Sequence, residues 1–240
     1  MSKLSFDVLY EDDIMVAISK PSGVLTLPDR HDGELQSLRG VLEKQYGKIF
    51  IVHRLDKDTS GVIVFAKDAD THKYLSQLFE SRDIEKLYLG LVAGKPAATE
   101  GTIDQPIAES TTRAGAMVIN KRGKASVTDY KVVNTFKGYS LVEFHIHTGR
   151  THQIRIHSKF LGNPIVCDNL YGDEKPLLLS ALKKKFKLSK DAEEEKPLLS
   201  RLALHAWKLT FKKPNGELLQ LEAPLPKDMQ ATVRQLEKLS

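Results

Sequence analysis

Residues 53–61 read HRLDKDTSG and concentrate side chains that could do chemistry. Four of them are charged: Arg54, Asp56, Lys57 and Asp58. They directly precede GVIVFA, whose β-branched residues are typical of a buried strand. Charges at the edge of a buried strand cost several kcal/mol unless they are paired. The aspartates therefore need cationic partners, either within the stretch or from a distant residue such as Arg155, and a solvated turn is the alternative.

Three common catalytic or binding patterns do not fit this sequence. An aspartic protease needs two paired carboxylates, but DTSG interrupts Asp-Thr-Gly with Ser60 and no second copy is present. A phosphate-binding loop needs GxxxxGK[ST], whereas GAMVINKRGKAS has seven residues between its glycines and Ala125 after the lysine. No GxGxxG opens a helix after a strand, so a dinucleotide site is also unsupported.

Four histidines fall within thirteen residues and suggest a metal site: His145, His147, His152 and His157. Neutral imidazoles bind zinc, but carboxylates and thiolates are scarce around them in the sequence. Histidines that face RNA phosphates, or that pack where a strand meets a helix, explain the group equally well. We therefore predict no metal.

The composition indicates a globular protein in a reducing compartment. The chain has 240 residues, 41% of them hydrophobic, and 36 Lys and Arg against 31 Asp and Glu give a net charge of +5. This charge suits a nucleic-acid partner without requiring one. The lone Cys167 excludes an internal disulfide, and we see neither a signal peptide nor a run of ~18 apolar residues. We expect a cytoplasmic monomer with no membrane contact.

The periodicity around the charged stretch predicts the elements that position it. MVAIS (15–19) reads as a strand, and KPSG then turns the chain into VLTLP (24–28) as a hairpin. A strand is expected at 61–66 and a helix at 68–83. In the following strand, 86–94, Tyr88 points opposite to the leucines and could face a cleft.

The second half of the chain predicts two hairpins and two helices. Paired strands are expected at 124–136 and 139–149, before a helix from near Thr151 to Gly162 that carries His152, Arg155 and Lys159 on one face. A second hairpin turns at PNG, and an amphipathic helix closes the chain at 227–239. The segment 173–200 has seven lysines and six acids, which favours a solvated helical insertion over an RNA-gripping arm.

With HRLDKDTSG, KLYLGLV and GRTHQIRIH in this order, the chain resembles the RluA-type pseudouridine synthases. The family motif HRLDxxTSG is matched at every fixed position, and the likeness extends from about residue 8 to 230 through DDIMVAISKPSGVLTLP, GKASVTDY, LHAWKLTF and APLPKDM. The resemblance implies an α+β pseudouridine synthase fold: a bent, mostly antiparallel mixed sheet flanked by helices and loops, with a central active-site cleft.

The resemblance also implies a function. Members of this family are isomerases that convert specific uridines in structured RNA, ribosomal or transfer, into pseudouridine, a reaction that needs no cofactor and no metal. The small RNA-binding domain that precedes the catalytic domain in many relatives has no room here. We therefore expect a single catalytic domain over 1–240, with 173–200 as an insertion longer than usual, and RNA as the partner.

The family motifs assign roles to individual residues. Asp56 matches the essential aspartate, Arg155 the arginine that pairs with it, and Tyr88 the active-site tyrosine, whose ring can stack on a base and whose phenol can relay a proton. Whether the aspartate attacks the sugar, adds to the uracil ring or assists an elimination stays open.

A paired uridine must be flipped out before Asp56 can reach it, at a cost of a few kcal/mol. Arg54 matches the family arginine that can occupy the vacated space and contact phosphate. The same motifs place His53, Arg150 and His152 among the expected RNA-binding residues.

Overall fold

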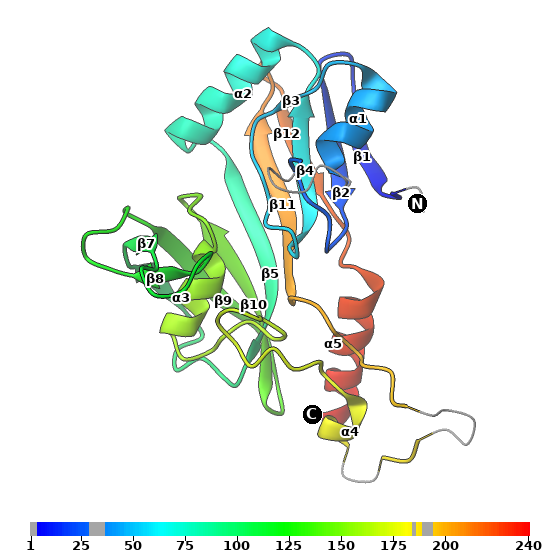
Figure 1. Cartoon of the computed structure of the whole chain (residues 1–240), viewed down its shortest axis with the longest axis vertical. Helices are drawn as coiled ribbons and strands as arrows, with labels where there is room; N and C mark the ends of the chain where they lie inside the picture. The colour runs from blue at the N-terminus through cyan, green and yellow to red at the C-terminus, as the bar shows by residue number, and fades with distance from the viewer. Residues whose placement is uncertain (1–3, 29–36, 184–185, 189–193) are drawn as a thin grey trace. The chain divides into compact units, whose positions relative to one another are not determined.

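The computed structural model describes residues 4–28, 37–183, 186–188 and 194–240. The chain divides into two compact units: the first comprises Met1–Tyr88 and His205–Pro224, the second Leu89–Leu204 and Leu225–Ser240. Each unit combines strands with helices, and the strands pair mostly antiparallel (Figure 1). This confirms the expected α+β class, whereas one catalytic domain over 1–240 stays a prediction.

The first unit is built around a fully buried strand, β4 (Ser60–Ala66). The other strands of this unit are β1 (Asp7–Glu11), β2 (Met15–Lys20), β3 (Phe50–Ile51), β11 (Leu204–Lys212) and β12 (Leu218–Glu222). Their order is β1-β2-β4-β11, with β3 also on β4 and β12 also on β11. β2 runs antiparallel to β4, so Ile18 lies opposite Ile63, while β11 runs parallel to β4.

Two helices pack beside these strands, and each begins at a side chain that satisfies an open backbone N–H (Figure 1). α1 (Leu38–Tyr46) begins after Ser37, whose hydroxyl accepts from the N–H of Gly40. α2 (Ala69–Ser81) begins after Asp68, which accepts from Thr71 at 2.8 Å. Buried leucines of both helices join the core that surrounds β4.

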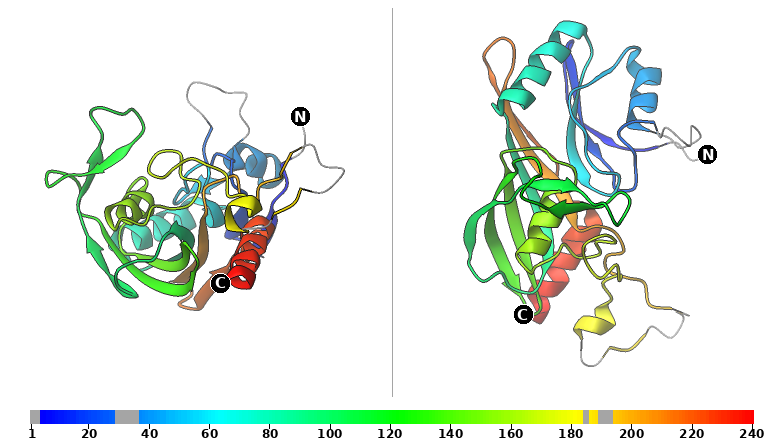
Figure 2. Two further views of the ribbon diagram at one scale, coloured as in Figure 1. Left: turned by 90° about the horizontal axis from the view of Figure 1, so that it is seen from below. Right: turned by 60° about the vertical axis from the view of Figure 1, so that its left-hand side comes forward.

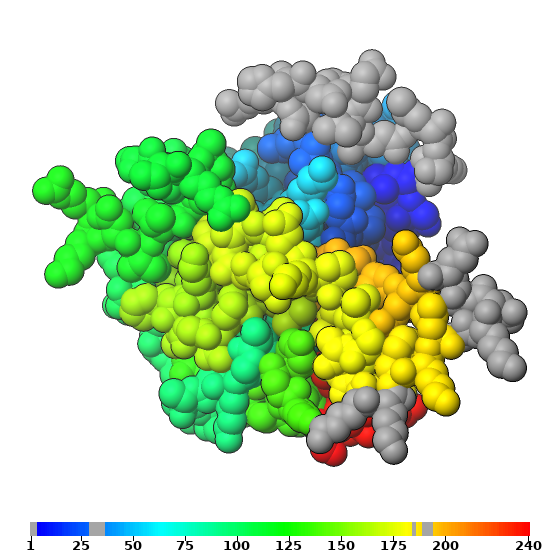
Figure 3. Space-filling model, turned by 60° about the horizontal axis from the view of Figure 1, so that its bottom comes forward, coloured from blue at the N-terminus to red at the C-terminus, as the bar shows by residue number. Residues whose placement is uncertain are grey.

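The second unit contains a sheet in the order β5-β10-β9-β6, made of β5 (Glu85–Ala93), β10 (Tyr139–Ile146), β9 (Val127–Phe136) and β6 (Glu100–Asp104). β5 belongs to this unit from Leu89 onward. The predicted hairpin of β9 and β10 is present and turns at Gly138, whose φ of 81° suits glycine. A small sheet of β7 (Ile107–Glu109) and β8 (Met117–Ile119) projects at one edge of the unit, in green in Figure 3.

Helix α3 (Gln153–Phe160) lies against the inner side of the curved strands β9 and β10 (Figure 2). Gln153 anchors its first turn, because the side-chain amide donates to Val127 O and Thr128 Oγ1 and its oxygen accepts from Thr148 and from the N–H of Arg150. The predicted C-terminal helix is α5 (Lys227–Leu239).

Two expectations for the elements are wrong. VLTLP does not return as a hairpin strand: Leu25 forms a parallel bridge to Ser37, and Thr26 binds Leu55 instead. In the described part of 173–200, helix is limited to α4 (Leu179–Leu182), and Leu177 bonds to Leu199 across the segment. Residues 184–185 and 189–193, which include two residues of KKKFK and one of EEE, lie outside the described residues.

In the part of the chain that the structure describes, no helix is both long and apolar enough to cross a membrane.

Candidate active site

The charged stretch forms an irregular loop that ends in a turn at Lys57 and Asp58, and the end of β2 together with the residues that follow it holds the backbone of this turn. Lys20 Nζ donates to the carbonyl of Lys57 at 2.7 Å, and the Ser22 hydroxyl donates to that of Asp58 at 2.6 Å. The backbone carbonyl of Asp56 accepts from the N–H of Thr59 at 3.2 Å. The main chain on the C-terminal side of Asp56 is therefore fixed, while its own side chain is half-buried.

Lys20 is a residue that the sequence reasoning missed. Its side chain is fully buried, and its ammonium also donates to the carbonyl of Pro21 at 2.9 Å. A buried ammonium must find hydrogen-bond partners, and here backbone oxygens of the turn provide them. In the sequence, Lys20 is visible only as a lysine at the end of a mostly apolar strand, directly before Pro21.

The exit from the turn depends on Gly61, which has a φ of 120°. A Cβ on this residue would lie 2.1 Å from the carbonyl oxygen of Ala206 in β11, so the parallel strands could not approach as they do. Next to it, Ser60 Oγ lies 2.9 Å from His205 Nδ1, and His205 Nε2 donates to the carbonyl of Ala223 at 2.9 Å. These contacts fix TSG to the core, with the serine hydroxyl donating to the imidazole.

His53 is engaged in the fold of the first unit. Its ring stacks on Phe79 with centroids 4.5 Å apart, and its Nε2 accepts from the N–H of Val64 at 3.1 Å. Burial, helped by the positive charge of Lys86, lowers the pKa of His53 to about 3, so the ring is neutral. Arg54 is exposed. The RNA-binding roles of His53 and Arg54 stay predictions.

Tyr88 and Asp56 lie within electrostatic reach of each other in the first unit. The ring of Tyr88 packs against the core of this unit. Burial raises the pKa of its phenol well above the usual value, and the negative charge of Asp56 raises it further. Tyr88 therefore keeps its proton at neutral pH beside the Asp56 carboxylate.

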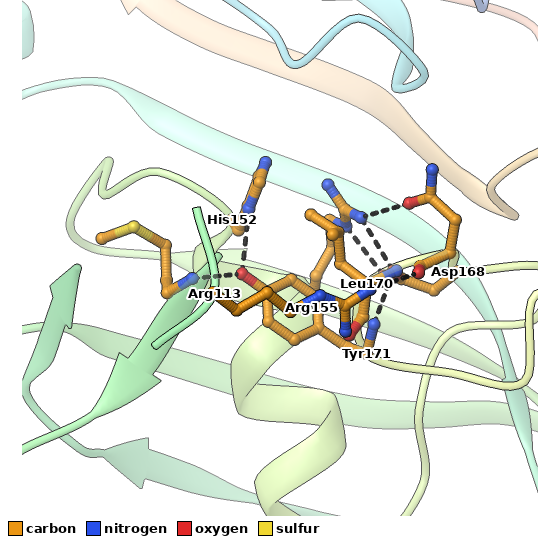
Figure 4. A network of polar contacts seen from close by, with 8 residues as sticks. Arg113, His152, Arg155, Asp168, Leu170 and Tyr171 are labelled. Carbon is orange, nitrogen blue, oxygen red and sulfur yellow. Dashed lines mark hydrogen bonds and ion pairs between the residues drawn. The ribbon is translucent and has the colours of Figure 1, made fainter. Parts of the chain in front are cut away.

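Arg155 is buried in the second unit, in a bidentate pair with Asp168 (Figure 4). Arg155 Nε donates to Asp168 Oδ2 and Nη2 to Oδ1, both at 2.7 Å. Asp168 is fully buried and also accepts from the N–H groups of Leu170 and Tyr171. Burial alone would raise the pKa of this carboxyl, but the hydrogen bonds and charge of Arg155 outweigh it and lower the pKa.

Tyr171 joins the Arg155 pair to the start of α3 and to β8 (Figure 4). The guanidinium of Arg155 lies over the Tyr171 ring, 5.1 Å from its centroid. The phenol oxygen of Tyr171 accepts from the N–H of Met117 at 2.7 Å and lies 2.9 Å from His152 Nδ1. Arg113 adds bonds to the carbonyls of Asn169 and Leu170. This network holds the plane of the Arg155 guanidinium in one orientation.

The structure brings the predicted residues together in two groups. His53, Arg54, Asp56 and Tyr88 belong to the first unit, and Arg150, His152 and Arg155 to the second. Within the second group, His152 adopts a left-handed backbone (φ 55°) at the start of α3, and Arg150 Nε donates to the carbonyl of Ala125 at 3.2 Å. The predicted pairing of Arg155 with Asp56 joins residues of different units and stays a prediction.

A family model described as RNA pseudouridylate synthase matches residues 14–159, more than half of the chain. The chain belongs to this family. The expected RluA-type assignment, and with it the class of RNA uridine isomerases, is confirmed.

Relatives along the whole chain agree with this assignment. The uncharacterized RNA pseudouridine synthase YhcT of Bacillus subtilis is 36% identical over 95% of this chain and 71% of its own length. Ribosomal large subunit pseudouridine synthase D of Nitrosomonas europaea is 34% identical over 97% of this chain, which spans 65% of that protein. The solved structure of human RNA Pseudouridylate Synthase Domain Containing 4 has 30% identity and a TM-score of 0.74, covering 96% of this chain and 92% of that chain.

In this pseudouridine synthase the four clustered histidines separate into different environments. His157 is buried and bonds to Thr128 Oγ1 and the carbonyl of Gln105, so it is part of the packing of α3. His152 belongs to the Tyr171 network, whereas His145 and His147 lie beside Asp129 on the sheet. The carboxylate near these two histidines was not visible as a neighbour in the sequence.

Proposed function

We propose that this chain isomerises uridines of large-subunit ribosomal RNA to pseudouridine, with Asp56 as the nucleophile and Tyr88 and Arg155 as its catalytic partners. The observation that carries the proposal is the fixed turn of HRLDKDTSG, which presents a half-buried aspartate beside a protonated tyrosine. The named relative of Nitrosomonas europaea favours ribosomal RNA over transfer RNA. We expect the enzyme to act in the cytoplasm and as a monomer.

The proposed chemistry follows from the groups that the two units hold. Asp56 supplies the carboxylate nucleophile, and the hydrogen bonds to the turn fix the backbone that presents it. Tyr88 offers a ring for stacking on uracil and an O–H for proton transfer, because its phenol stays protonated. Arg155 offers a guanidinium whose orientation is set in advance by Asp168, so little side-chain entropy is lost on engaging an anion.

Exposed basic residues support an RNA partner. They lie in the loop between β7 and β8 or shortly after β8: Arg113, Lys121, Arg122 and Lys124. We refer to these four residues as the basic rim. Phosphate contacts by such side chains supply much of the affinity for RNA. Arg54 is also exposed, next to the turn, and is therefore able to fill the space that a flipped base leaves.

The substitution Asp56→Asn tests the proposal. The purified variant, incubated with large-subunit ribosomal RNA that lacks pseudouridine, should form none, because an amide cannot act as the nucleophile. RNA affinity should stay within several fold, since the side chain keeps its shape. Pseudouridine is measured by mass spectrometry of nuclease digests.

Asp58→Asn is the matched control, because Asp58 lies in the same turn at a variable position of the family motif. This variant should retain most of the wild-type rate. Wild-type turnover in Asp56→Asn would remove Asp56 from the mechanism, and modification of transfer RNA alone would overturn the ribosomal substrate while leaving the chemistry intact.

A further inference from the structure

The outer face of the sheet in the second unit carries three side chains that can bind a metal. β9 and β10 pair so that His145 lies opposite Asp129. His147 follows two residues later, and its N–H still bonds to the carbonyl of Val127 on β9, so its side chain leaves the same face. One ligand atom from each of these residues lies within 4.8 Å of the other two.

This face is opposite to the one that α3 covers. Thr128, the neighbour of Asp129, bonds to Gln153 and His157 of α3, and alternation along a strand turns Asp129 the other way. The cluster of Asp129, His145 and His147 is therefore separate from the network around Arg155, which lies on α3.

The cluster is partly organised before any ligand binds. The hydroxyl of Thr102 donates to Asp129 Oδ1 at 2.6 Å, while Asp129 Oδ2 lies 2.6 Å from His147 Nε2. The rings of His145 and His147 have centroids 4.3 Å apart. About 40% of the side chains of Asp129 and His147 is exposed, so an ion from solvent can reach them.

The charges around the cluster favour a cation over a phosphate group. Asp129 and His145 line a cavity of about 370 Å³ together with Glu100, Glu143 and Lys131. Three carboxylates and one ammonium give these lining residues a formal charge of 1 − 3 = −2 with neutral histidines. An RNA phosphate would meet repulsion here, whereas a divalent cation would neutralise the site.

We propose that Asp129, His145 and His147 form a binding site for a divalent transition metal, with Zn²⁺ the best match to two imidazoles and one carboxylate. Ligand atoms of a tetrahedral zinc at ~2.0–2.1 Å lie about 3.3 Å apart, so the three side chains need to move by roughly 1 Å. Water, or a carboxylate of Glu100 or Glu143, completes the coordination. The ion links β9 to the end of β10 and plays no part in the proposed isomerisation.

The experiment is a titration of the chelator-treated full chain with ZnCl₂ by calorimetry, followed by Co²⁺ as a spectroscopic probe of tetrahedral coordination. We expect one equivalent of zinc to bind. Each of His145→Gln, His147→Gln and Asp129→Asn should weaken the affinity at least about tenfold. Zinc should raise the unfolding midpoint of the wild type but not that of these variants, because an ion that binds the folded state stabilises it.

His72→Gln is the matched control, because His72 is a half-exposed histidine of the first unit that bonds to Ile51. It should bind zinc like the wild type. Circular dichroism without metal verifies that each variant is folded. Each of the three single substitutions tests one proposed zinc ligand independently of the others. Absence of zinc binding, equal binding by the wild type and all three variants, or binding of inorganic phosphate in place of zinc would overturn the proposal.

Discussion

Asp168 controls the orientation of Arg155 because it binds the guanidinium through both of its oxygens and is itself fully buried. We predict that Asp168→Asn lowers the free energy of unfolding by about 3 kcal/mol, since breaking a buried pair leaves an uncompensated charge. The misoriented Arg155 should lower kcat more than it changes KM. Urea unfolding and steady-state pseudouridine formation measure the two effects.

Arg201 and Asp228 provide a control with the same bidentate geometry in a more exposed place. Their two hydrogen bonds measure 2.7 and 2.8 Å, and 39% of the Asp228 side chain is exposed. Asp228→Asn should therefore cost about 1 kcal/mol or less and leave kcat unchanged. Equal losses of unfolding free energy in Asp168→Asn and Asp228→Asn would show that the burial of Asp168 does not raise the cost of breaking its ion pair.

The neutral ring of His53 makes the first unit sensitive to acid. The pKa of this residue is about 3 in the folded state against about 6.5 in an unfolded chain, so below pH 6.5 the unfolded state binds the extra proton. The free energy of unfolding must then fall as the pH drops from about 6.5 toward 3, by up to about 2 kcal/mol at pH 5.

His53→Gln should remove this part of the pH dependence, because an amide oxygen can still accept from the N–H of Val64 but does not titrate. The variant should be less stable than the wild type at pH 7, having lost the stack on Phe79, yet its stability should change less between pH 7 and pH 5. An equal change in the free energy of unfolding between pH 7 and pH 5 in the variant and the wild type would contradict the neutral state of His53.

At the scale of elements, the parallel approach of β4 and β11 depends on Gly61. We predict that Gly61→Ala costs several kcal/mol, because the new Cβ meets the Ala206 carbonyl at 2.1 Å in addition to the strain of a positive φ. Gly216→Ala, with a φ of 85° and open space around it, should cost only about 1–2 kcal/mol. Thermal unfolding measures the loss of stability in each variant. A similar loss in both would mean that β11 can move away from the new Cβ at residue 61.

Elements with strong local periodicity were predictable, and those fixed by distant contacts were not. The hairpins of β9 with β10 and β11 with β12, and the helices α2 and α5, follow from alternation, Gly138, PNG and amphipathic spacing. The sequence of 24–28 looks like a strand, but Thr26 bonds to Leu55, 29 residues away, which no local pattern encodes. β7 and β8 have three residues each, too few for alternation to be visible.

The same limit applies to the site. Asp56, Tyr88 and Arg155 could be proposed because they lie in recognisable motifs. Lys20 and Asp168 could not, because their importance comes from burial: Lys20 reaches a carbonyl 37 residues away, and Asp168 binds an arginine on a helix that ends before it. No local pattern of residue types in the sequence marks a buried charge whose partner is distant along the chain.

At the scale of the whole molecule, we expect the net charge of +5 to promote RNA binding mainly where basic residues cluster on the surface. Three members of the basic rim follow the end of β8 within five positions: Lys121, Arg122 and Lys124. We predict that replacing these three by alanine weakens RNA binding at least about tenfold, because each phosphate contact releases a counterion. The slope of log K against log salt should become shallower by about 2, given roughly 0.7 per contact with single-stranded RNA.

A triple alanine variant of Lys44, Lys73 and Lys238 removes the same charge from exposed positions elsewhere and separates local contact from overall charge. Fluorescence anisotropy with labelled ribosomal RNA over a range of salt concentrations should give this control a nearly unchanged slope. If both triple variants lost affinity equally, the RNA would respond to net charge alone and the basic rim would not be a contact surface. If only the rim variant lost affinity while its kcat at saturating RNA stayed near the wild-type value, these residues would hold the substrate and leave the chemistry to the turn at Asp56.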